Sequence, residues 1–364
     1  MLSCTDLPPL TSPVREWLVH LADPLGRGPR PAHDLSSEEV PAVLSAASQH
    51  GVLPAAIRGV ADCTGGRAAE GRSEIASALA TARESAALQA GLGLMLRHHG
   101  GRVSRAFQAA NIEGAIVKGA VAATRLYSDP SLRTFTDVDV LVRATDRAAV
   151  SNVMRALGFE LFTFPDRAGR DYEEDKWLLA GEPKVMVEVH TNLVHSPKLR
   201  SAMSVRYDDV LEAGDGDCAA PTALLFVASA HAAIGHQFDR LQHLVDILQG
   251  VRSAPGRVDV NRLRAAAARS GVLFPLVTAI ELTGRVFRDP ECLDLAHRLD
   301  PAYARCWRRL LIGSDVVADA QTVKRPYASW RRKLYRQCLK WASTRGLREK
   351  RGFHPGLLCD GHLR

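Results

Sequence analysis

The chain has 364 residues, of which 46% are hydrophobic, and its formal net charge is +7. This length and apolar content argue against a disordered chain and allow two or three packed units. The basic excess is local, because residues 321–364 contain twelve Lys or Arg and only two acidic residues. No stretch approaches the roughly 18 uninterrupted apolar residues of a membrane helix, and residues 1–10 lack the pattern of a secretory signal. We therefore expect a cytoplasmic protein without a membrane span.

The seven cysteines are odd in number and scattered, and no two of them form a CxxC pair. This argues against both a disulfide framework and a zinc ribbon. We predict that they are reduced thiols that mostly serve in packing.

Residues 1–110 are predicted to be helical. A short helix is expected over residues 14–21, and Ser36-x-x-Glu39 has the pattern of a capping box for the next one. Residues 68–110 are rich in Ala, Leu, Glu and Arg, which favours a long helix. The pair Gly100-Gly101 predicts a break or bend in that helix.

Residues 111–215 have a different pattern. Residues 115–117 (Ala-Ile-Val) predict a strand, and Lys118-Gly119 then leads into a helix-like segment. A strand, a tight turn and a helix start can present backbone N–H groups to phosphate. Further strands are predicted at residues 138–142, 159–164, 176–180 and 185–189, with a helix over 145–157. Together they predict a small mixed β-sheet backed by two helices.

Residues 216–320 return to helical patterns, and residues 321–364 form a basic tail. The predicted fold class is therefore α/β (α+β), with a small mixed sheet flanked by helical regions on both sides along the chain.

Two acids stand at the beginning of the strand predicted at residues 138–142. In the sequence TDVDVLV, Asp137 and Asp139 alternate with apolar residues, so they lie on one face and only a few Å apart. Carboxylates this close repel each other unless a cation compensates them. Mg²⁺ prefers hard oxygen ligands and often binds one or two carboxylates together with substrate phosphates. The pair therefore suits a complex of metal and triphosphate.

A third acid, Glu188, interrupts the apolar strand VMVEVH. An acid within a run of branched apolar residues is costly without a partner. If this strand lies beside the one that carries Asp137 and Asp139, Glu188 can ligate a metal or orient the attacking hydroxyl. His190 follows on the same face, where a hydrogen-bonded structural histidine is favoured over a metal ligand.

The segments GAIVKGAVAATRLYSDPSLRTFTDVDVLV and VMVEVHTNL resemble the uncharacterised nucleotidyltransferase-like family of the polymerase β superfamily. The resemblance extends from about residue 88 to residue 287. Its most specific part is a set of residues in a fixed order: Lys118-Gly119, Tyr127, Arg133, Asp137-x-Asp139 and Glu188-x-His190. The later helices match more loosely, through His231, Arg240 and Asp246.

The resemblance implies a nucleotidyltransferase that moves a nucleoside monophosphate from a nucleoside triphosphate (NTP) to an acceptor and releases pyrophosphate. It implies that Asp137 and Asp139 bind Mg²⁺ or Mn²⁺ and that Glu188 completes the triad. It also implies phosphate contacts for three residues, Lys118, Gly119 and Arg133. Superfamily members commonly have Gly-Ser where this chain has Lys118-Gly119, as the resembled family does.

The residues leave several roles open. Lys118 is either a phosphate ligand or a solvated lysine at a strand end, and Arg133 binds phosphate, orders the loop before Asp137, or does both. Asp246 and Arg240 lie in an apolar helix, where an internal ion pair competes with a substrate role. The acceptor is an RNA end, a peptide or protein, or a small molecule.

Two other functional classes compete with nucleotidyl transfer. The first is an inactive module that keeps the fold and binds RNA or peptide through the basic tail. The second is a metal-dependent glycosyltransferase, which also uses Asp-x-Asp but requires a larger α/β domain than the roughly eighty residues available here. The retained acids argue against the inactive module, because unbalanced carboxylates are costly to keep together.

Two further features bear on metal and polyanion binding. His231, His236 and His243 are separated by five and seven residues, so we do not expect them to share one helical face or to form a zinc site. Residues 321–351 carry basic and aromatic residues at helical spacing. That segment is either a solvated face or a contact for a polyanion such as RNA or a membrane surface.

Overall fold

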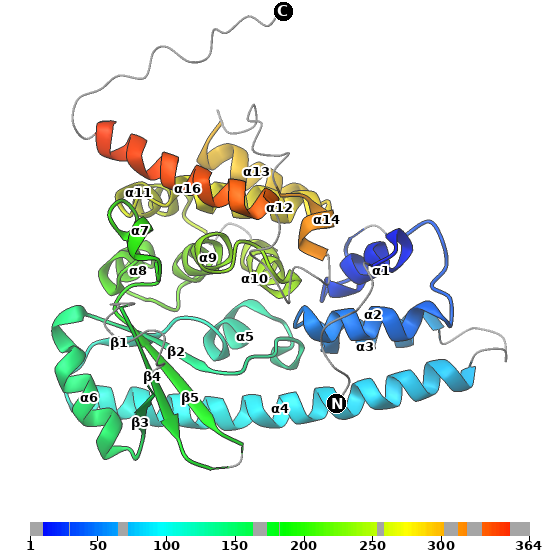
Figure 1. The fold of residues 1–364 in the computed structure, drawn as a ribbon, viewed down its shortest axis with the longest axis horizontal. Helices are drawn as coiled ribbons and strands as arrows, with labels where there is room; N and C mark the ends of the chain where they lie inside the picture. The colour runs from blue at the N-terminus through cyan, green and yellow to red at the C-terminus, as the bar shows by residue number, and fades with distance from the viewer. Residues whose placement is uncertain are drawn as a thin grey trace, which may run out of the picture.

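A five-stranded mixed sheet and the helices around it make up this computed structural model (Figure 1). The structure describes residues 10–28, 30–64, 72–162, 173–181, 183–252, 258–301, 312–318 and 330–349. The strands are β1 (Gly114–Ile116), β2 (Val138–Val142), β3 (Glu160–Phe162), β4 (Glu174–Leu179) and β5 (Val185–His190). Their order is β1-β2-β5-β4-β3, in which β2 and β5 are parallel and the other neighbours are antiparallel. The predicted mixed sheet and fold class are confirmed.

The strands β2 and β5 are rich in valine, which explains their place at the centre of the sheet. Every residue of β2 is buried, and β5 is buried except at Met186. Such valine-rich runs suit strands that are covered on both faces. The edge strand β3 has three exposed residues and covers part of the strand predicted over residues 159–164, of which residues 163 and 164 lie outside the described residues.

Three helices pack near the sheet: α4 (Arg72–Ala109), α5 (Ala120–Leu126) and α6 (Arg147–Ala156). Figure 1 shows α4 running along the sheet and on beneath the N-terminal helices. The predicted break at Gly100-Gly101 is wrong, because α4 continues through both glycines. A Cβ at Gly100 would lie 3.1 Å from Ile116 Cδ1 and 3.3 Å from Val138 Cγ1. The close approach of helix to sheet offsets the penalty of roughly 1 kcal/mol for a helical glycine.

Substitutions at these two glycines are expected to have opposite effects on the free energy of unfolding. Gly100→Leu should lower it by about 1–3 kcal/mol, because the new side chain must push α4 away from Ile116 and Val138. Gly101→Ala should raise it by about 0.5–1 kcal/mol, since alanine is the better helix former. The nearest atom to a Cβ at Gly101 is Arg105 Nη1, at 3.4 Å. Urea denaturation tests both variants, and equal destabilisation would contradict this account of the packing.

The remaining N-terminal helices are α1 (Ser12–Ala22), α2 (Glu39–Gln49) and α3 (Leu53–Thr64). The capping-box pattern before α2 is confirmed by its reciprocal hydrogen bonds. Ser36 N donates to Glu39 Oε2 at 2.9 Å, and Glu39 N donates to Ser36 Oγ at 3.2 Å.

The C-terminal helical region follows the sheet. Its helices are α7 (Pro197–Arg200), α8 (Tyr207–Ala213), α9 (Pro221–Ala230), the π-helix η4 (His231–Gly235), α10 (Leu241–Arg252), α11 (Val260–Arg269), α12 (Leu273–Phe287), α13 (Pro290–Leu299), α14 (Ser314–Ala318) and α16 (Trp330–Glu349). None of the helices among the described residues is long and apolar enough to cross a membrane.

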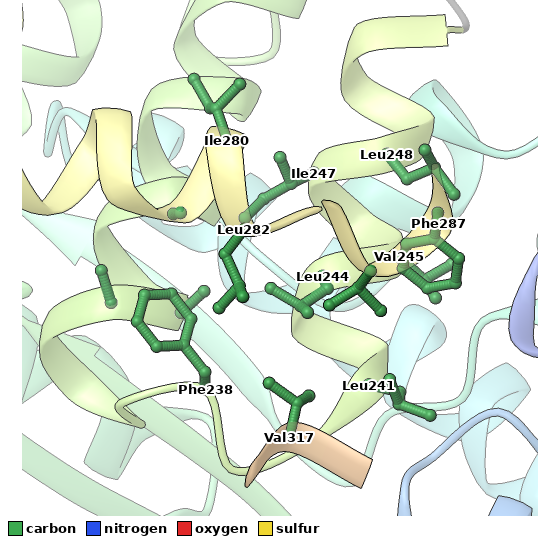
Figure 2. Packing of buried hydrophobic residues seen from close by; sticks show 14 of the residues in the cluster. Phe238, Leu241, Leu244, Val245, Ile247, Leu248, Ile280, Leu282, Phe287 and Val317 are labelled. Atoms are coloured by element: carbon green, nitrogen blue, oxygen red, sulfur yellow. The ribbon is translucent and has the colours of Figure 1, made fainter. Parts of the chain in front are cut away.

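One hydrophobic cluster joins the N-terminal helices to the C-terminal ones, and Figure 2 shows the part of it around α10 and α12. Helix α1 packs against α10, α12 and α14. The buried Arg252 of α10 supports this contact, because its guanidinium pairs with Asp23 at 2.8 Å and with Asp289 at 2.7 Å. A second cluster lies between the sheet, α4 and α6. The predicted division at residues 110, 215 and 320 stays a prediction.

The basic tail contributes to the core through the first half of α16. The side chain of Arg332 is fully buried and donates hydrogen bonds to the carbonyl oxygens of Gln237 and Phe238. Tyr335 of the same helix is also buried. Arg332 is therefore a structural residue rather than a polyanion ligand, and contact of residues 321–351 with a polyanion stays a prediction for the rest of that segment.

The cysteines that the structure describes are consistent with the predicted reduced thiols. Cys63, Cys218 and Cys292 are free thiols, and Cys218, Cys292 and Cys338 are buried. The other three cysteines lie outside the described residues.

Candidate active site

The predicted acids meet where β2 and β5 run side by side. Asp139 and Glu188 are Cα partners across this parallel pair, and Asp137 lies immediately before β2. Because side chains alternate along an extended chain, Asp137 and Asp139 share a face. The structure thus brings together all three carboxylates that the sequence singled out.

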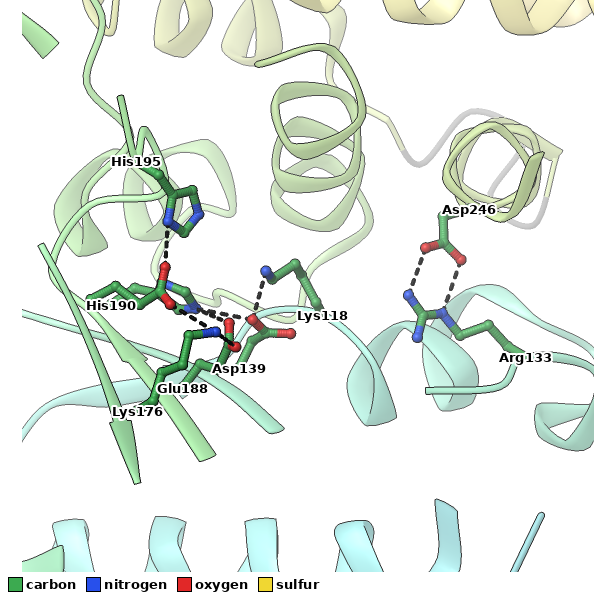
Figure 3. Close-up of polar contacts among 9 residues, drawn as sticks. Lys118, Arg133, Asp139, Lys176, Glu188, His190, His195 and Asp246 are labelled. Atoms are coloured by element: carbon green, nitrogen blue, oxygen red, sulfur yellow. Dashed lines mark hydrogen bonds and ion pairs between the residues drawn. The ribbon is translucent and has the colours of Figure 1, made fainter. Parts of the chain in front are cut away.

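Two lysines and a histidine contact these acids (Figure 3). Lys118 Nζ lies 2.6 Å from Asp139 Oδ1, and His190 Nε2 lies 2.9 Å from the same oxygen. Burial raises the pKa of Asp139, but the Lys118 charge and the His190 hydrogen bond outweigh it and hold that pKa well below its usual range. Lys176 forms an ion pair with Glu188, its partner across β4 and β5. Asp139 is therefore held as a carboxylate.

Asp137 lacks such a partner. Among the described residues it has no hydrogen bond or ion pair, although it is partly buried. Burial, followed by the negative charges of Asp139 and Glu188, raises the pKa of Asp137 to about 6. Asp139, Glu188 and His190 each offer a ligand atom within 4.8 Å of the others. A divalent cation that prefers hard oxygen ligands, Mg²⁺ or Mn²⁺, fits the carboxylates of Asp139 and Glu188 with Asp137 beside them, and it would relieve the repulsion at Asp137.

The raised pKa of Asp137 predicts a stability that depends on pH. Because the pKa is higher in the folded state than in the unfolded state, the associated stabilisation is complete below about pH 4 and is lost as the pH rises through about 6. In EDTA at about pH 8, Asp137→Asn should therefore be more stable than the wild type, by on the order of 2 kcal/mol. At about pH 4 the two proteins should be equally stable.

Thermal denaturation at both pH values checks this expectation, with Mg²⁺ added in a second series. Mg²⁺ should raise the melting temperature of the wild type but not that of Asp137→Asn. A variant less stable than the wild type in EDTA at the higher pH would show that Asp137 is not under repulsion.

The Lys118-Gly119 turn connects β1 to α5. The Val117 N–H donates to the Asp139 carbonyl at 3.1 Å, so the pairing of β1 with β2 continues up to this turn. Gly119 has φ 50° and ψ −106°, a conformation that residues with a side chain rarely adopt. The Lys118 side chain is only 10% exposed, so the interpretation of a solvated strand-end lysine is wrong. The turn therefore places the Lys118 ammonium group in contact with the Asp139 carboxylate.

Arg133 lies in an ion pair apart from the acids (Figure 3). Its Nε and Nη2 donate to the two carboxylate oxygens of Asp246, at 3.0 and 2.7 Å, and the Tyr127 hydroxyl donates to Oδ1 at 2.7 Å. All three side chains are buried, so this pair orders the loop before Asp137, one of the roles that the sequence left open. A phosphate contact of Arg133 would have to use its remaining N–H groups, which are the second one on Nη2 and those on Nη1, and Nη1 also donates to the Thr134 carbonyl at 3.3 Å.

Sequence reasoning missed Glu174, Lys176 and His195. Glu174 is the Cα partner of His190 across β4 and β5, and its Oε2 lies 2.6 Å from His195 Nδ1. Burial raises the pKa of Glu174, but the hydrogen bond from His195 outweighs it and holds that pKa below its usual range. The available signal was the alternation of Glu174 and Lys176 in EDKWLL. The predicted strand began at Lys176, which left Glu174 in a loop.

A cavity of about 800 Å³ lies over these groups. Its size falls within the range of roughly 300–1,000 Å³ that is typical of small-molecule sites. All six predicted site residues line it, together with residues from α7, from residues 231–243 and from α16. On the helical side they include Arg240, whose role the sequence left open, and Arg336.

The structure brings the three histidines together from two different helices. His231 begins the π-helix η4, and the His236 N–H donates to the His231 carbonyl at 3.2 Å, five residues back. The chain then turns, and α10 brings His243 to the same place. Each histidine offers a ring nitrogen within 4.8 Å of the others. The three histidines do not share one helical face, as expected, since His243 comes from α10. Their separations did not predict that they come together in space, because a π-turn brings residues five apart onto one side and the turn before α10 then adds His243.

Comparison with known families agrees with the chemistry of these residues. A family model described as uncharacterised nucleotidyltransferase matches residues 36–288, which is more than half of the chain. The match includes the Lys118-Gly119 turn, both acid-bearing strands and α10. Searches of curated proteins and of solved structures gave no match. The chain therefore belongs to the uncharacterised nucleotidyltransferase family, and it is an enzyme with an NTP substrate.

Proposed function

We propose that the protein transfers a nucleoside monophosphate from an NTP to an acceptor hydroxyl or phosphate. The acceptor oxygen bonds to the α-phosphorus, the bond from that phosphorus to the bridging oxygen breaks, and pyrophosphate leaves. The observation that carries this proposal is the pairing of Asp139 with Glu188 across two parallel strands, with the unpartnered Asp137 beside them. These three acids are the proposed ligands of Mg²⁺ or Mn²⁺.

The chain's own residues supply position and charge. A divalent cation bound at the acids would stabilise the attacking and leaving oxygens of an in-line displacement. Lys118 adds a positive charge at the same edge of the cavity and is proposed to contact the phosphates once a cation takes over the neutralisation of Asp139. Gly119 leaves the backbone open to close approach by a phosphate. A reaction of this kind needs no covalent nucleophile.

Glu188 and Lys176 are proposed to act as a pair. Lys176 also lies 2.9 Å from Glu174 Oε1, so its ammonium bridges two carboxylates. This bridge fixes the Glu188 side chain, which completes the ligand set with Asp137 and Asp139. The acceptor is an oxygen nucleophile on an RNA end, a peptide or protein, or a small molecule.

Position-specific labelling tests the proposal. The protein is incubated with Mg²⁺, with total RNA or cell lysate, and with each NTP carrying ³²P at either the α or the γ position. We expect the α label to appear on an acceptor, the γ label to appear in pyrophosphate, and both to require the metal. Transfer of the γ label to the acceptor would show phosphoryl transfer and contradict the proposal. The absence of any transfer would favour the inactive binding module.

A further inference from the structure

A cluster of three histidines lies on the helical wall of the cavity, away from the strands that carry the acids. We propose that His231, His236 and His243 form a second metal site, which binds a transition metal with the preferences of Zn²⁺. The proposal concerns metal binding alone, so it stands or falls independently of nucleotidyl transfer.

The geometry of the rings supports a single shared ion. The ring centroids are 4.5 Å apart for His231 and His236, 5.1 Å for His231 and His243, and 4.4 Å for His236 and His243. Imidazole nitrogens suit Zn²⁺ and similar ions, whereas Mg²⁺ prefers oxygen ligands. Three protein ligands leave one tetrahedral position open, as in catalytic zinc sites. All three histidines line the cavity, so an ion held by them would be reached from the cavity.

Asp239 lies beside two of the rings and is hydrogen-bonded to His236. Its Oδ2 lies 3.3 Å from His236 Nδ1, and its Oδ1 lies 3.3 Å from His243 Nε2. The hydrogen bond of His236 Nδ1 to Asp239 leaves His236 Nε2 for a metal. His243 is 8% exposed, and within the described residues neither of its ring nitrogens has a hydrogen-bond partner. A carboxylate that accepts from the far nitrogen of a ligating histidine is a recurrent feature of metal sites.

The backbone that assembles the cluster is itself unusual. The π-helix η4 is followed by Gln237 and Phe238, which have φ of 51° and 62°, values that residues with side chains seldom adopt. Strained backbone of this kind persists only where the surroundings hold it, and it concentrates at functional sites. Arg332 of α16 supplies that support, because it donates to the carbonyl oxygens of both strained residues. Helix α16 therefore braces the segment between His236 and His243.

Metal titration of the full chain tests the site. After treatment with a chelator, the protein is titrated with Zn²⁺, and separately with Co²⁺, whose visible absorption reports tetrahedral coordination. We expect one Zn²⁺ per chain at this site and a tetrahedral Co²⁺ spectrum. His236→Gln should weaken Zn²⁺ binding by at least about 100-fold, and Asp239→Asn, which removes no ligand, by about 10–100-fold.

His236 is the ligand of choice for the test, because its side chain is 38% exposed and its replacement leaves the core intact. His98→Gln, an exposed histidine of α4, is the matched control and should leave Zn²⁺ affinity unchanged. Asp139→Asn should also retain the Zn²⁺ site. No Zn²⁺ binding by the wild type, or binding that survives His236→Gln but is lost in Asp139→Asn, would overturn the proposal.

Discussion

Asp139→Asn is expected to lower the rate of nucleotidyl transfer by at least about 10³-fold, the factor that corresponds to several kcal/mol of transition-state stabilisation. The substitution removes one negative charge from the proposed metal site. It also removes the charge partner of Lys118, whose Nζ lies 2.6 Å from the carboxylate. Single-turnover assays with α-labelled NTP measure the effect, and they are repeated over a range of metal concentrations.

Two variants serve as controls for this result. Asp208→Asn carries the same change at a 68% exposed carboxylate that pairs with Arg143, outside the cavity. It should keep the full rate. Asp137→Asn should lose transfer as Asp139→Asn does, yet the two should differ in stability, because only Asp139 has a cationic partner. An Asp139→Asn enzyme that retains more than about a tenth of the wild-type rate would place the chemistry elsewhere.

The second large effect is expected at the ion pair of Arg133 and Asp246. Asp246→Leu should lower the free energy of unfolding by about 3–5 kcal/mol, because it leaves the guanidinium of Arg133 buried without a counter-charge. The Tyr127 hydroxyl loses its acceptor in the same variant. Arg133→Met should have an effect of similar size, and the double variant should cost much less than the sum of the two. Urea denaturation of the wild type, the two single variants and the double variant completes this double-mutant cycle.

An exposed pair provides the comparison. Arg30 and Asp34 lie 3.3 Å apart with side chains 54% and 79% exposed, so Asp34→Asn should change the free energy of unfolding by no more than about 1 kcal/mol. If Asp246→Leu cost as little as Asp34→Asn, the pair of Arg133 and Asp246 would not be what orders the loop before Asp137.

The strands of the sheet and the positions of the acids could be predicted, because both follow the alternation of side chains along a strand. The apolar runs VDVLV and VMVEVH identified β2 and β5, and the acids within them identified the residues that need a partner. An unpaired acid in a buried strand is costly, so the sequence alone indicated that Glu188 has a cationic partner. The structure adds the register, in which Asp139 lies opposite Glu188 on the neighbouring parallel strand.

Contacts between distant segments were not predictable in the same way. The sequence left the role of Arg133 open, and only the fold shows that Asp246, more than a hundred residues away, binds its guanidinium. The histidine cluster depends on a π-turn and on two left-handed residues, which helical periodicity does not encode. Arg332 was counted with a basic surface segment, yet it is buried because Gln237 and Phe238 present carbonyl groups to it.

The most direct test of the central claim is a crystal structure of the protein with Mn²⁺ and an NTP analogue that cannot be cleaved between the α- and β-phosphates. Anomalous scattering locates Mn²⁺ without reference to the expected ligands. We predict a Mn²⁺ peak bound by the carboxylates of Asp137 and Asp139, with the triphosphate in the same cavity beside Lys118. A triphosphate bound outside this cavity, or Mn²⁺ absent from the acids when the analogue is bound, would contradict the account.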